Sequence, residues 1–437
     1  MKKNYFLNIS TLIFILLLTT CTNSENEHLT NSANDEIIIS PYASTKNEIL
    51  GDAKKFYEDI ASSELRSLSR QIDYEKTEIS SYYEKIPVTS DMQVKKSVKY
   101  QQIPVYMINY KTENNEPAGF VIKAGDSRTG NLTLAFSDEG HFDGFDKLEE
   151  SDGGYFKERI GAYIFSTIEQ IPISEEMEKR ANAVYTRAYK PPLLKVTWNQ
   201  HPSPYYDYAP ICSGKTPTPA GCVTIALAQI MTFHKWPEKG YYIRKTTGQS
   251  TPVVYNYWNE ITKTPKAINL TNSNHKEHVA NLCAEIGYRT FTNYNCSGST
   301  ASNYNIIGAL KKMGYKNMIL RSERDQNYDF VYVWDDIMME RPVYMATENR
   351  ELWEAHAYVV DGIQTVQANN GYGRNFYIHV NFGWGGQSNG FYLVYPGIKA
   401  NEPIFIDEEF EFRTTPTIIT NIQKDSQNSG ATNANLF

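Results

Sequence analysis

The pattern of apolar residues changes part-way along the segment that follows Pro191-Pro192, and this change constrains the fold more than any other feature. The first half of the segment has apolar residues at helical spacing, in the stretches 222–235, 278–291 and 302–313. The second half has short strand-like stretches, at 342–346, 355–361, 375–381 and 390–395. Helices that precede antiparallel strands predict an α+β domain with two lobes, a helical lobe and an antiparallel β lobe. A cleft between the lobes would take residues from both.

A second α+β block precedes this domain. Its pattern predicts two amphipathic helices and three short strands, at 48–68 and 155–170, and at 102–110, 119–124 and 132–137. The block carries no group of candidate catalytic residues. A charged segment before Pro191-Pro192 is the best linker, and a length of 437 residues favours two domains. We therefore divide this part of the chain into domains 36–188 and 189–437.

The first 35 residues predict export from the cell. Two lysines precede an apolar run, 12–18, which is too short to span a membrane comfortably. The following Leu18-Thr19-Thr20-Cys21 resembles the lipobox of bacterial lipoproteins, with Thr20 in place of the usual glycine, alanine or serine. We predict a signal peptide, 1–20, lipidation of Cys21 and a polar tether, 21–35. A plain cleaved signal and an uncleaved anchor are the alternatives, so the protein is expected in the cell envelope or secreted.

Charge and cysteine content limit the partners. The formal net charge is −7 and no basic patch stands out, which argues against nucleic acid as a partner. The chain has five cysteines. The spacing of Cys212, Cys283 and Cys296 matches no metal site, and the count gives no disulfide framework. A bridge between Cys212 and Cys296 is one open pairing, and the sequence does not favour it.

Cys222 is the strongest candidate for chemistry. It lies in Ala220-Gly221-Cys222-Val223-Thr224, where a loop rich in proline, threonine and glycine changes into a helical pattern. The backbone N–H groups and the dipole of a helix N-terminus favour a thiolate and can hold an oxyanion. A cysteine by itself is more often a small core residue, so its partners decide between the two interpretations.

The partners are His356, at the start of one predicted strand, and Asn381, at the end of the next. Cysteine first, then histidine and asparagine much later, is the order of papain-like enzymes. The imidazole deprotonates the thiol, the side-chain amide holds the imidazole in the productive tautomer, and Trp384 keeps water from their contact. His379 shares a strand face with Asn381 and is the alternative base. It lacks the position at a strand start, and we assign it a structural role.

With these residues the chain resembles the streptopain family of secreted bacterial cysteine peptidases, peptidase family C10. The matching stretches are Ala220-Gly221-Cys222-Val223, Ala355-His356-Ala357-Tyr358-Val359-Val360-Asp361-Gly362, and Gly373 to Asn381 continuing into Gly383-Trp384-Gly385-Gly386. Residues 119–128 resemble the inhibitory propeptide of that family. The resemblance therefore covers most of the chain after the tether.

The resemblance implies a papain-like catalytic domain that follows an α+β inhibitory prodomain. In it, Cys222 is the nucleophile, His356 is the general base and acid, and Asn381 and Trp384 orient and shield the imidazole. No metal or organic cofactor is implied.

Three further residues take roles from the resemblance. Gln200, in Trp198-Asn199-Gln200, would help the backbone N–H of Cys222 to hold the oxyanion. Ser299 would belong to the wall that binds the substrate peptide. Ala355 would belong to it too, although the family usually has glycine there.

Together these features predict the zymogen of a papain-like cysteine endopeptidase, which hydrolyses peptide bonds through a thioester. Its partners would be protein or peptide substrates, its own propeptide as inhibitor, and a membrane through the lipid. Proteolysis within 180–190 would activate it. Two alternatives remain open: a catalytically silent surface lipoprotein that binds host protein, and an acyl transferase that uses an amine as acceptor.

Overall fold

The computed structural model describes residues 36–61, 71–88, 98–130, 132–145, 154–169, 186–212, 214, 216–244, 247–322, 330–349, 355–367, 374–398 and 414–428. The predicted signal peptide, the tether and Cys21 lie outside these residues. None of the helices within the described ranges is both long and apolar enough to cross a bilayer.

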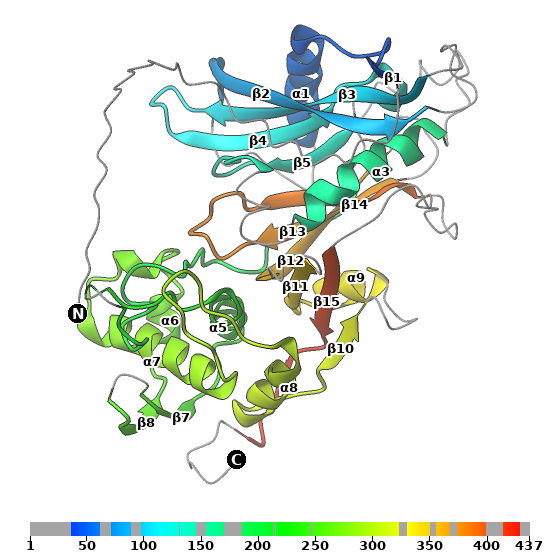
Figure 1. Ribbon diagram of the computed structural model, residues 1–437. Helices are drawn as coiled ribbons and strands as arrows, with labels where there is room; N and C mark the ends of the chain where they lie inside the picture. The colour runs from blue at the N-terminus through cyan, green and yellow to red at the C-terminus, as the bar shows by residue number, and fades with distance from the viewer. Residues whose placement is uncertain are drawn as a thin grey trace, which may run out of the picture. The chain divides into compact units, whose positions relative to one another are not determined.

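One twelve-stranded sheet runs through the described residues, and both predicted domains contribute to it (Figure 1). Its order is β1-β3-β4-β5-β14-β13-β12-β11-β15-β10, with β2 on β3 and β6 on β12. The strands before residue 180 are β1 (Glu36–Ile39), β2 (Asp73–Pro87), β3 (Val98–Lys111), β4 (Pro117–Ala124) and β5 (Thr133–Ser137). Those after it are β6 (Thr186–Lys190), β10 (Ile319–Ser322), β11 (Val343–Asn349), β12 (Ala355–Gln367), β13 (Arg374–Asn381), β14 (Gly390–Ile398) and β15 (Thr414–Thr420).

The antiparallel pair β5 and β14 joins the two domains. Phe136 lies opposite Phe391 at this junction, and their rings are stacked with centroids 5.3 Å apart. Helix α3 (Tyr155–Glu169) crosses the junction, because it packs against β2 on one side and against β14 on the other (Figure 1). The amphipathic pattern predicts this helix correctly. The domain division drawn from the sequence gives no sign that the two sheets are continuous.

The upstream domain is completed by α1 (Lys46–Ala61), which packs on β3 and β4. A short 3-10 turn, η1 (Ser127–Thr129), follows the buried carboxylate of Asp126. This carboxylate accepts hydrogen bonds from the Ser40 hydroxyl at 2.7 Å and from the Arg128 guanidinium at 2.7 and 2.9 Å. The network ties the first residues of the domain to the stretch that resembles the family's propeptide.

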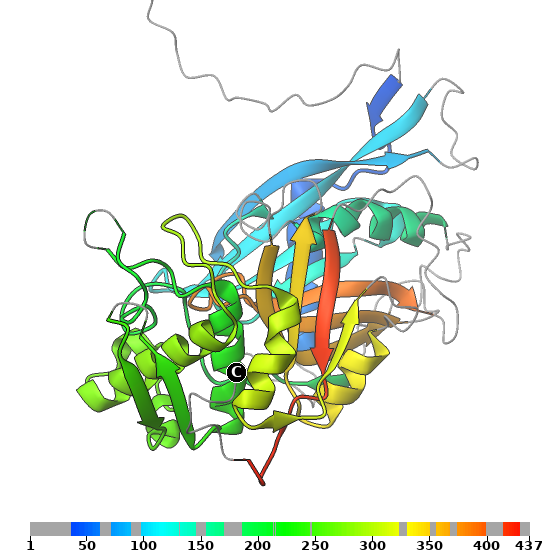
Figure 2. The same ribbon diagram turned by 60° about the horizontal axis from the view of Figure 1, so that its bottom comes forward.

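The helical lobe lies on one side of the downstream strands (Figure 2). It consists of helices α5 (Cys222–His234), α6 (Trp258–Ile261), α7 (Ser273–Arg289) and α8 (Asn303–Lys312), the turn η2 (Ala267–Asn269), and the hairpin β7 (Lys239–Ile243) with β8 (Ser250–Val254). The remaining elements are α9 (Val331–Met338) and the pair β9 (Tyr315–Lys316) with β16 (Gln423–Lys424). Helix α5 is buried over most of its length because it packs against β11 and β12 on one side and α7 on the other. Two lobes of this kind confirm the predicted α+β class.

Two hydrophobic cores meet at β12. The first is shared between the domains and includes Phe120, Phe136, Phe156, Tyr358, Phe382, Phe391 and Tyr392. The second fills the helical lobe and takes all its buried residues from Leu194 onward. Along β12, Tyr358 and Val360 belong to the first core, whereas Ala357 and Val359 belong to the second, as the alternation of side chains in a strand requires.

A disulfide joins Cys212 to Cys296, with Cα atoms 5.8 Å apart. The sequence does not favour this bridge, and that interpretation is wrong. The two cysteines lie in loops that are distant in sequence, and the fold of the helical lobe brings these loops together. Cys222 and Cys283 are free thiols.

Candidate active site

Cys222 is the first residue of α5, as the sequence predicts. The preceding Gly221 has φ of +92°, where a side chain is strained, and a Cβ there would lie 3.0 Å from the carbonyl oxygen of Ser299. Glycine thus allows the loop to turn sharply into the helix beside Ser299. The turn places the thiol of Cys222 at the helix N-terminus.

The Cys222 thiol is half-buried. Desolvation by the surrounding protein raises its pKa above the ordinary value. Hydrogen bonding to the backbone at Ala357, Val223 and Cys222 itself opposes this rise. The start of β12 therefore lies directly against the thiol, and the amides needed to stabilise a thiolate already surround it.

His356 is the second residue of β12 and is 2% exposed. Its Nε2 lies 2.8 Å from the carbonyl oxygen of Phe382. A carbonyl oxygen can only accept, so Nε2 of the neutral imidazole carries the proton and Nδ1 has the free lone pair. Burial lowers the pKa of His356 to about 4, which keeps the imidazole neutral in this form.

Asn381 ends β13 as predicted, but its amide does not hold the imidazole directly. Its Nδ2 donates to the carbonyl oxygen of Val196 at 3.0 Å, and its Oδ1 accepts from the N–H of Gly383 at 3.2 Å. This N–H and the carbonyl that binds His356 belong to one peptide group, the one between Phe382 and Gly383. Asn381 therefore orients the peptide that orients the imidazole.

Trp384 covers the imidazole, as the sequence predicts. Its ring centroid lies 4.8 Å from that of His356, and it stacks on Phe382 at 4.8 Å with an interplanar angle of 10°. The N–H of the following Gly385 donates to the carbonyl of Trp198 at 2.9 Å, which fixes this turn against the segment before Gln200. Aromatic rings thus shield the bond between His356 and Phe382 from solvent.

In the described residues no hydrogen bond joins Cys222 to His356. Ala357, which follows His356, bonds to the thiol, so the two catalytic candidates are neighbours. Burial raises the pKa of the thiol and lowers that of the imidazole, so it disfavours the charged form of each group.

The other predicted site residues also lie near Cys222. The carbonyl of Gln200 accepts from the N–H of Ala220 at 3.2 Å, which ties Gln200 to the loop before the nucleophile. Ser299 is buried, and its hydroxyl donates to the carbonyl of Pro219 at 2.6 Å. Ala355 is exposed at the first position of β12, next to His356. Gln200 and Ser299 thus contact the loop before Cys222, and Ala355 precedes His356 in β12.

Residues 198–392 match the Peptidase C10 family. Streptopain from Streptococcus pyogenes is 28% identical over 322 residues, which are 65% of this chain and 74% of streptopain. The thiol protease/hemagglutinin PrtT from Porphyromonas gingivalis is 26% identical over 307 residues, which are 64% of this chain and 33% of that protein. Among solved structures, a fragment of prointerpain A from Prevotella intermedia gives a TM-score of 0.47 at 17% identity, covering 77% of this chain and 98% of the fragment.

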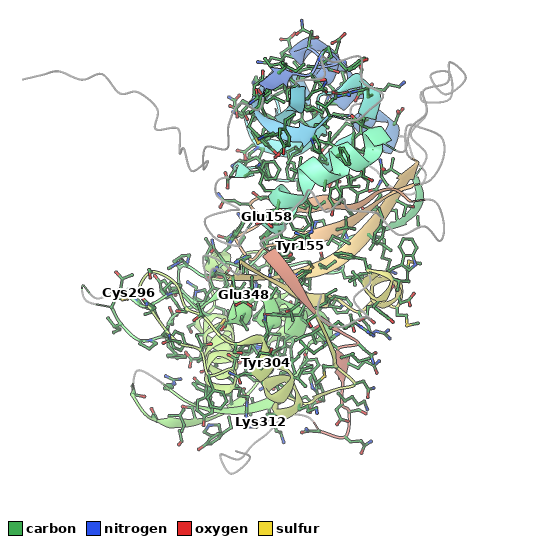
Figure 3. All side chains as sticks on the ribbon, turned by 45° about the vertical axis from the view of Figure 1, so that its right-hand side comes forward. Tyr155, Glu158, Cys296, Tyr304, Lys312 and Glu348 are labelled. Carbon is green, nitrogen blue, oxygen red and sulfur yellow. A yellow bond between two sulfur atoms is a disulfide. The ribbon has the colours of Figure 1, made fainter. Side chains whose placement is uncertain are left out.

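The upstream domain packs against the histidine side of the site. Phe156 on α3 packs on Phe382, with ring centroids 6.2 Å apart, and on Tyr392 at 4.6 Å. The carbonyl of His141 accepts from the N–H of Ser388 at 3.1 Å, in the loop that follows Trp384. Figure 3 labels Tyr155 and Glu158 on α3, which lies along the strands at the junction. The acceptor that orients His356 is thus packed against the upstream domain.

His379 is engaged elsewhere in the downstream domain. Its Nδ1 lies 2.5 Å from a carboxylate oxygen of Asp361, and its ring packs edge-on against Phe391 at 5.0 Å. The other oxygen of Asp361 accepts from the N–H of Leu194 at 3.0 Å. These contacts fit the structural role expected for His379, which anchors the first residues of the downstream domain.

Two residues of this site are missed by the sequence reasoning. The carbonyl of Phe382 is a backbone group, so no residue type announces it. Asn389 accepts from the N–H of Phe382 at 3.0 Å and is nearly buried, and the only sequence signal is an amide residue in a glycine-rich turn. Within the described ranges, no three His, Cys, Asp or Glu side chains gather as they would around a metal ion.

Proposed function

We propose that this C10 cysteine peptidase is an exported endopeptidase zymogen, which its upstream domain holds inactive until proteolysis. The observation that carries the proposal is the tautomer of His356. With Nε2–H held by Phe382, the lone pair of Nδ1 is the only basic position of the imidazole, and the Cys222 thiol, at the N-terminus of α5, is bonded to Ala357, the residue after His356.

The residues support acylation in the following order. Nδ1 of His356 takes the proton of the Cys222 thiol, and the thiolate attacks the carbonyl carbon of the scissile peptide bond. The backbone N–H of Cys222 and the side chain of Gln200 hold the oxyanion. The tetrahedral intermediate then collapses to a thioester, while His356 returns the proton to the leaving amine.

Water completes the reaction. His356 deprotonates a water molecule, the resulting hydroxide adds to the thioester, and Cys222 leaves as thiolate and regains its proton. Trp384 and Phe382 limit other water at the imidazole, because their stacked rings cover it. No step needs a metal or an organic cofactor.

We attribute latency to the burial of both groups. Desolvation disfavours the thiolate and the imidazolium together, and part of the packing around His356 comes from Phe156 of the upstream domain. Removal of that domain admits water to the histidine side and favours the ion pair. We expect the activating cut within 180–185, because Thr186–Lys190 already form β6, paired with β12.

The N-terminal part of the proposal concerns location. Lipidation of Cys21 would hold the zymogen at a membrane, and a cut within 180–185 would release the active domain from the lipid. Metabolic labelling with a radioactive fatty acid tests this, because label is expected on the full-length protein and on the excised upstream fragment. Label on the active species would contradict it.

The test of function compares the wild-type chain with Cys222→Ala. The wild type is expected to shorten and to cleave casein under reducing conditions, whereas the variant stays full length and inactive. If neither protein cleaves casein, the peptidase proposal is wrong and a silent binding protein is the better interpretation. If the thioester is instead resolved by a fluorescent primary amine in preference to water, the protein is an acyl transferase.

A further inference from the structure

Two loops form a wall beside the nucleophile. The first, 210–221, leads into Cys222 and is closed by two hydrogen bonds, from Cys212 N–H to Thr216 and from Thr218 N–H to Pro210, both at 2.8 Å. The second, 293–300, carries Ser299 and is closed by reciprocal bonds between Asn293 and Thr300, at 2.8 and 3.0 Å. These hydrogen bonds hold the two ends of each loop together.

The two loops are tied to each other at two points. The inner tie is the hydrogen bond from the buried Ser299 hydroxyl to the Pro219 carbonyl. The outer tie is the disulfide between Cys212 and Cys296. Figure 3 labels Cys296 on a loop at the outer edge of the helical lobe. A single hydrogen bond allows one loop to pivot against the other, whereas two separated ties remove this freedom.

The packing at the inner tie leaves the two loops little room to move. At Gly221 the backbone already packs so closely on Ser299 that a Cβ would lie 3.0 Å from its carbonyl oxygen. Ala220 is bonded to Gln200, so a pivot of the first loop also moves the side chain expected to hold the oxyanion. A shift of either loop therefore changes the peptide-binding side of Cys222 before it changes the helix that carries the thiol.

We propose that the disulfide between Cys212 and Cys296 is a positioning element of the peptidase, which fixes the wall that binds the substrate peptide. The proposal rests on the peptidase function argued above. The bridge acts through Ser299 and Pro219 and does not touch the reacting atoms. With the bridge intact the enzyme binds peptides more tightly, and with the bridge open the chemistry at Cys222 continues on more weakly held substrate.

The proposal has a redox consequence, because Cys222 works only as a reduced thiol. Cys296 is exposed and Cys212 is half-buried, so a small dithiol reaches the bridge from solvent. Dithiothreitol gives two electrons and two protons to the sulfur–sulfur bond, which yields two cysteine thiols and the cyclic disulfide of the reagent. As its concentration increases, dithiothreitol first keeps Cys222 reduced and then opens the disulfide. The peptidase activity measured at low substrate concentration therefore passes through a maximum.

The experiment uses the mature enzyme, obtained from the full chain, and a double variant in which Cys212→Ala is combined with Cys296→Ala. Cys283→Ala is the matched control, because it also removes a cysteine from the helical lobe but leaves the bridge intact. We expect the KM for fluorescent casein to rise about tenfold in the double variant while kcat changes less than about twofold. The control should keep the wild-type KM.

Reductant dependence supplies a second readout. The wild type and Cys283→Ala should show a maximum of activity with increasing dithiothreitol, and mass spectrometry after alkylation should find the bridge open beyond it. The activity of the double variant should instead rise to a plateau as the dithiothreitol concentration increases. An unchanged KM in the double variant, or a maximum that persists in it, overturns this inference and leaves the peptidase function intact. A wild type that cleaves no casein at any reductant concentration overturns both.

Discussion

Cys222 and His356 belong to one site, yet the side chains packed around them come from different parts of the chain. The helix of Cys222 rests on a core whose buried residues all lie from Leu194 onward. The strand of His356 and the carbonyl of Phe382 rest on a core that also contains Phe156 from the upstream domain. The nucleophile side thus takes its core from the downstream domain alone, whereas the histidine side is completed by the upstream segment, which the proposed activating cut would remove.

This difference indicates where the zymogen is controlled. Loss of the upstream domain would uncover Phe391 and Tyr392 of β14 and remove Phe156 from Phe382, whereas the buried core of the helical lobe would lose none of its residues. Side chains in a close-packed core are held in place by their neighbours. Removal of one of them therefore leaves space into which the others can rearrange. Control through the base, with a nucleophile already placed, follows from the division of the two cores.

The largest effect should come from His356. In the mature enzyme, His356→Ala removes the base and is expected to lower kcat/KM by at least about 10³-fold. His379→Ala should keep most of the activity, because its imidazole is paired with Asp361. Kinetics on casein for both variants measure this. Equal losses in the two variants would contradict the assignment of the base.

A second comparison tests the two cores directly. Phe156→Ala in the full chain removes a buried ring from the shared core, and Leu282→Ala removes a buried side chain from the helical core. Each should lower the free energy of unfolding by about 3–5 kcal/mol, measured by urea denaturation of proteins that also carry Cys222→Ala. Only Phe156→Ala should speed self-processing of the chain with an intact Cys222, since only this ring packs behind Phe382. Faster processing in both variants would point to general destabilisation.

Acid should destabilise the fold on both the nucleophile side and the histidine side of the site. Burial lowers the pKa of His356 to about 4, that of His234 to about 4 and that of His278 to about 3. Above pH 6.5 these groups are neutral in the folded and unfolded chains. As the pH falls from 6.5 towards 4 the unfolded chain binds protons first, so each group costs on the order of 3 kcal/mol of stability near pH 4.

Urea unfolding of the Cys222→Ala zymogen between pH 7.5 and 5 checks this expectation. The fall in stability should begin below pH 6.5 and become shallower in His278→Gln, which removes the contribution of one helical-lobe histidine. A stability that stays constant down to pH 5 would show that these imidazoles are hydrated in solution.

The sequence predicts the parts of this molecule that depend on local pattern. The change from loop to helix locates Cys222 at a helix start, and the strand pattern locates His356 and Asn381 at strand ends. Three features depend on tertiary packing and leave no such pattern. These are the continuous sheet through β5 and β14, the bridge between Cys212 and Cys296, and the carbonyl of Phe382 as acceptor. A backbone carbonyl is present at every residue, so only its position can identify it.

The smallest effect should come from Asn389. Its side chain accepts a hydrogen bond from the N–H of Phe382, the residue whose carbonyl binds His356. Asn389→Ala leaves the N–H of Phe382 unpaired in a buried place, at a cost of about 1–3 kcal/mol. The Phe382 carbonyl would then hold Nε2–H of His356 less firmly. We expect kcat to fall about tenfold with little change in KM, and the acid limb of the kcat profile to shift.

Asn389→Asp separates positioning from stability, because it keeps an oxygen that accepts from Phe382 N–H. This variant should recover most of the lost kcat, and its folding should resemble that of the wild type. If Asn389→Ala loses stability while kcat and the pH profile stay unchanged, Asn389 only holds the turn together. A kcat loss that the aspartate restores would instead show that the histidine side depends on a backbone peptide held from both ends, by Asn389 at Phe382 and by Asn381 at Gly383.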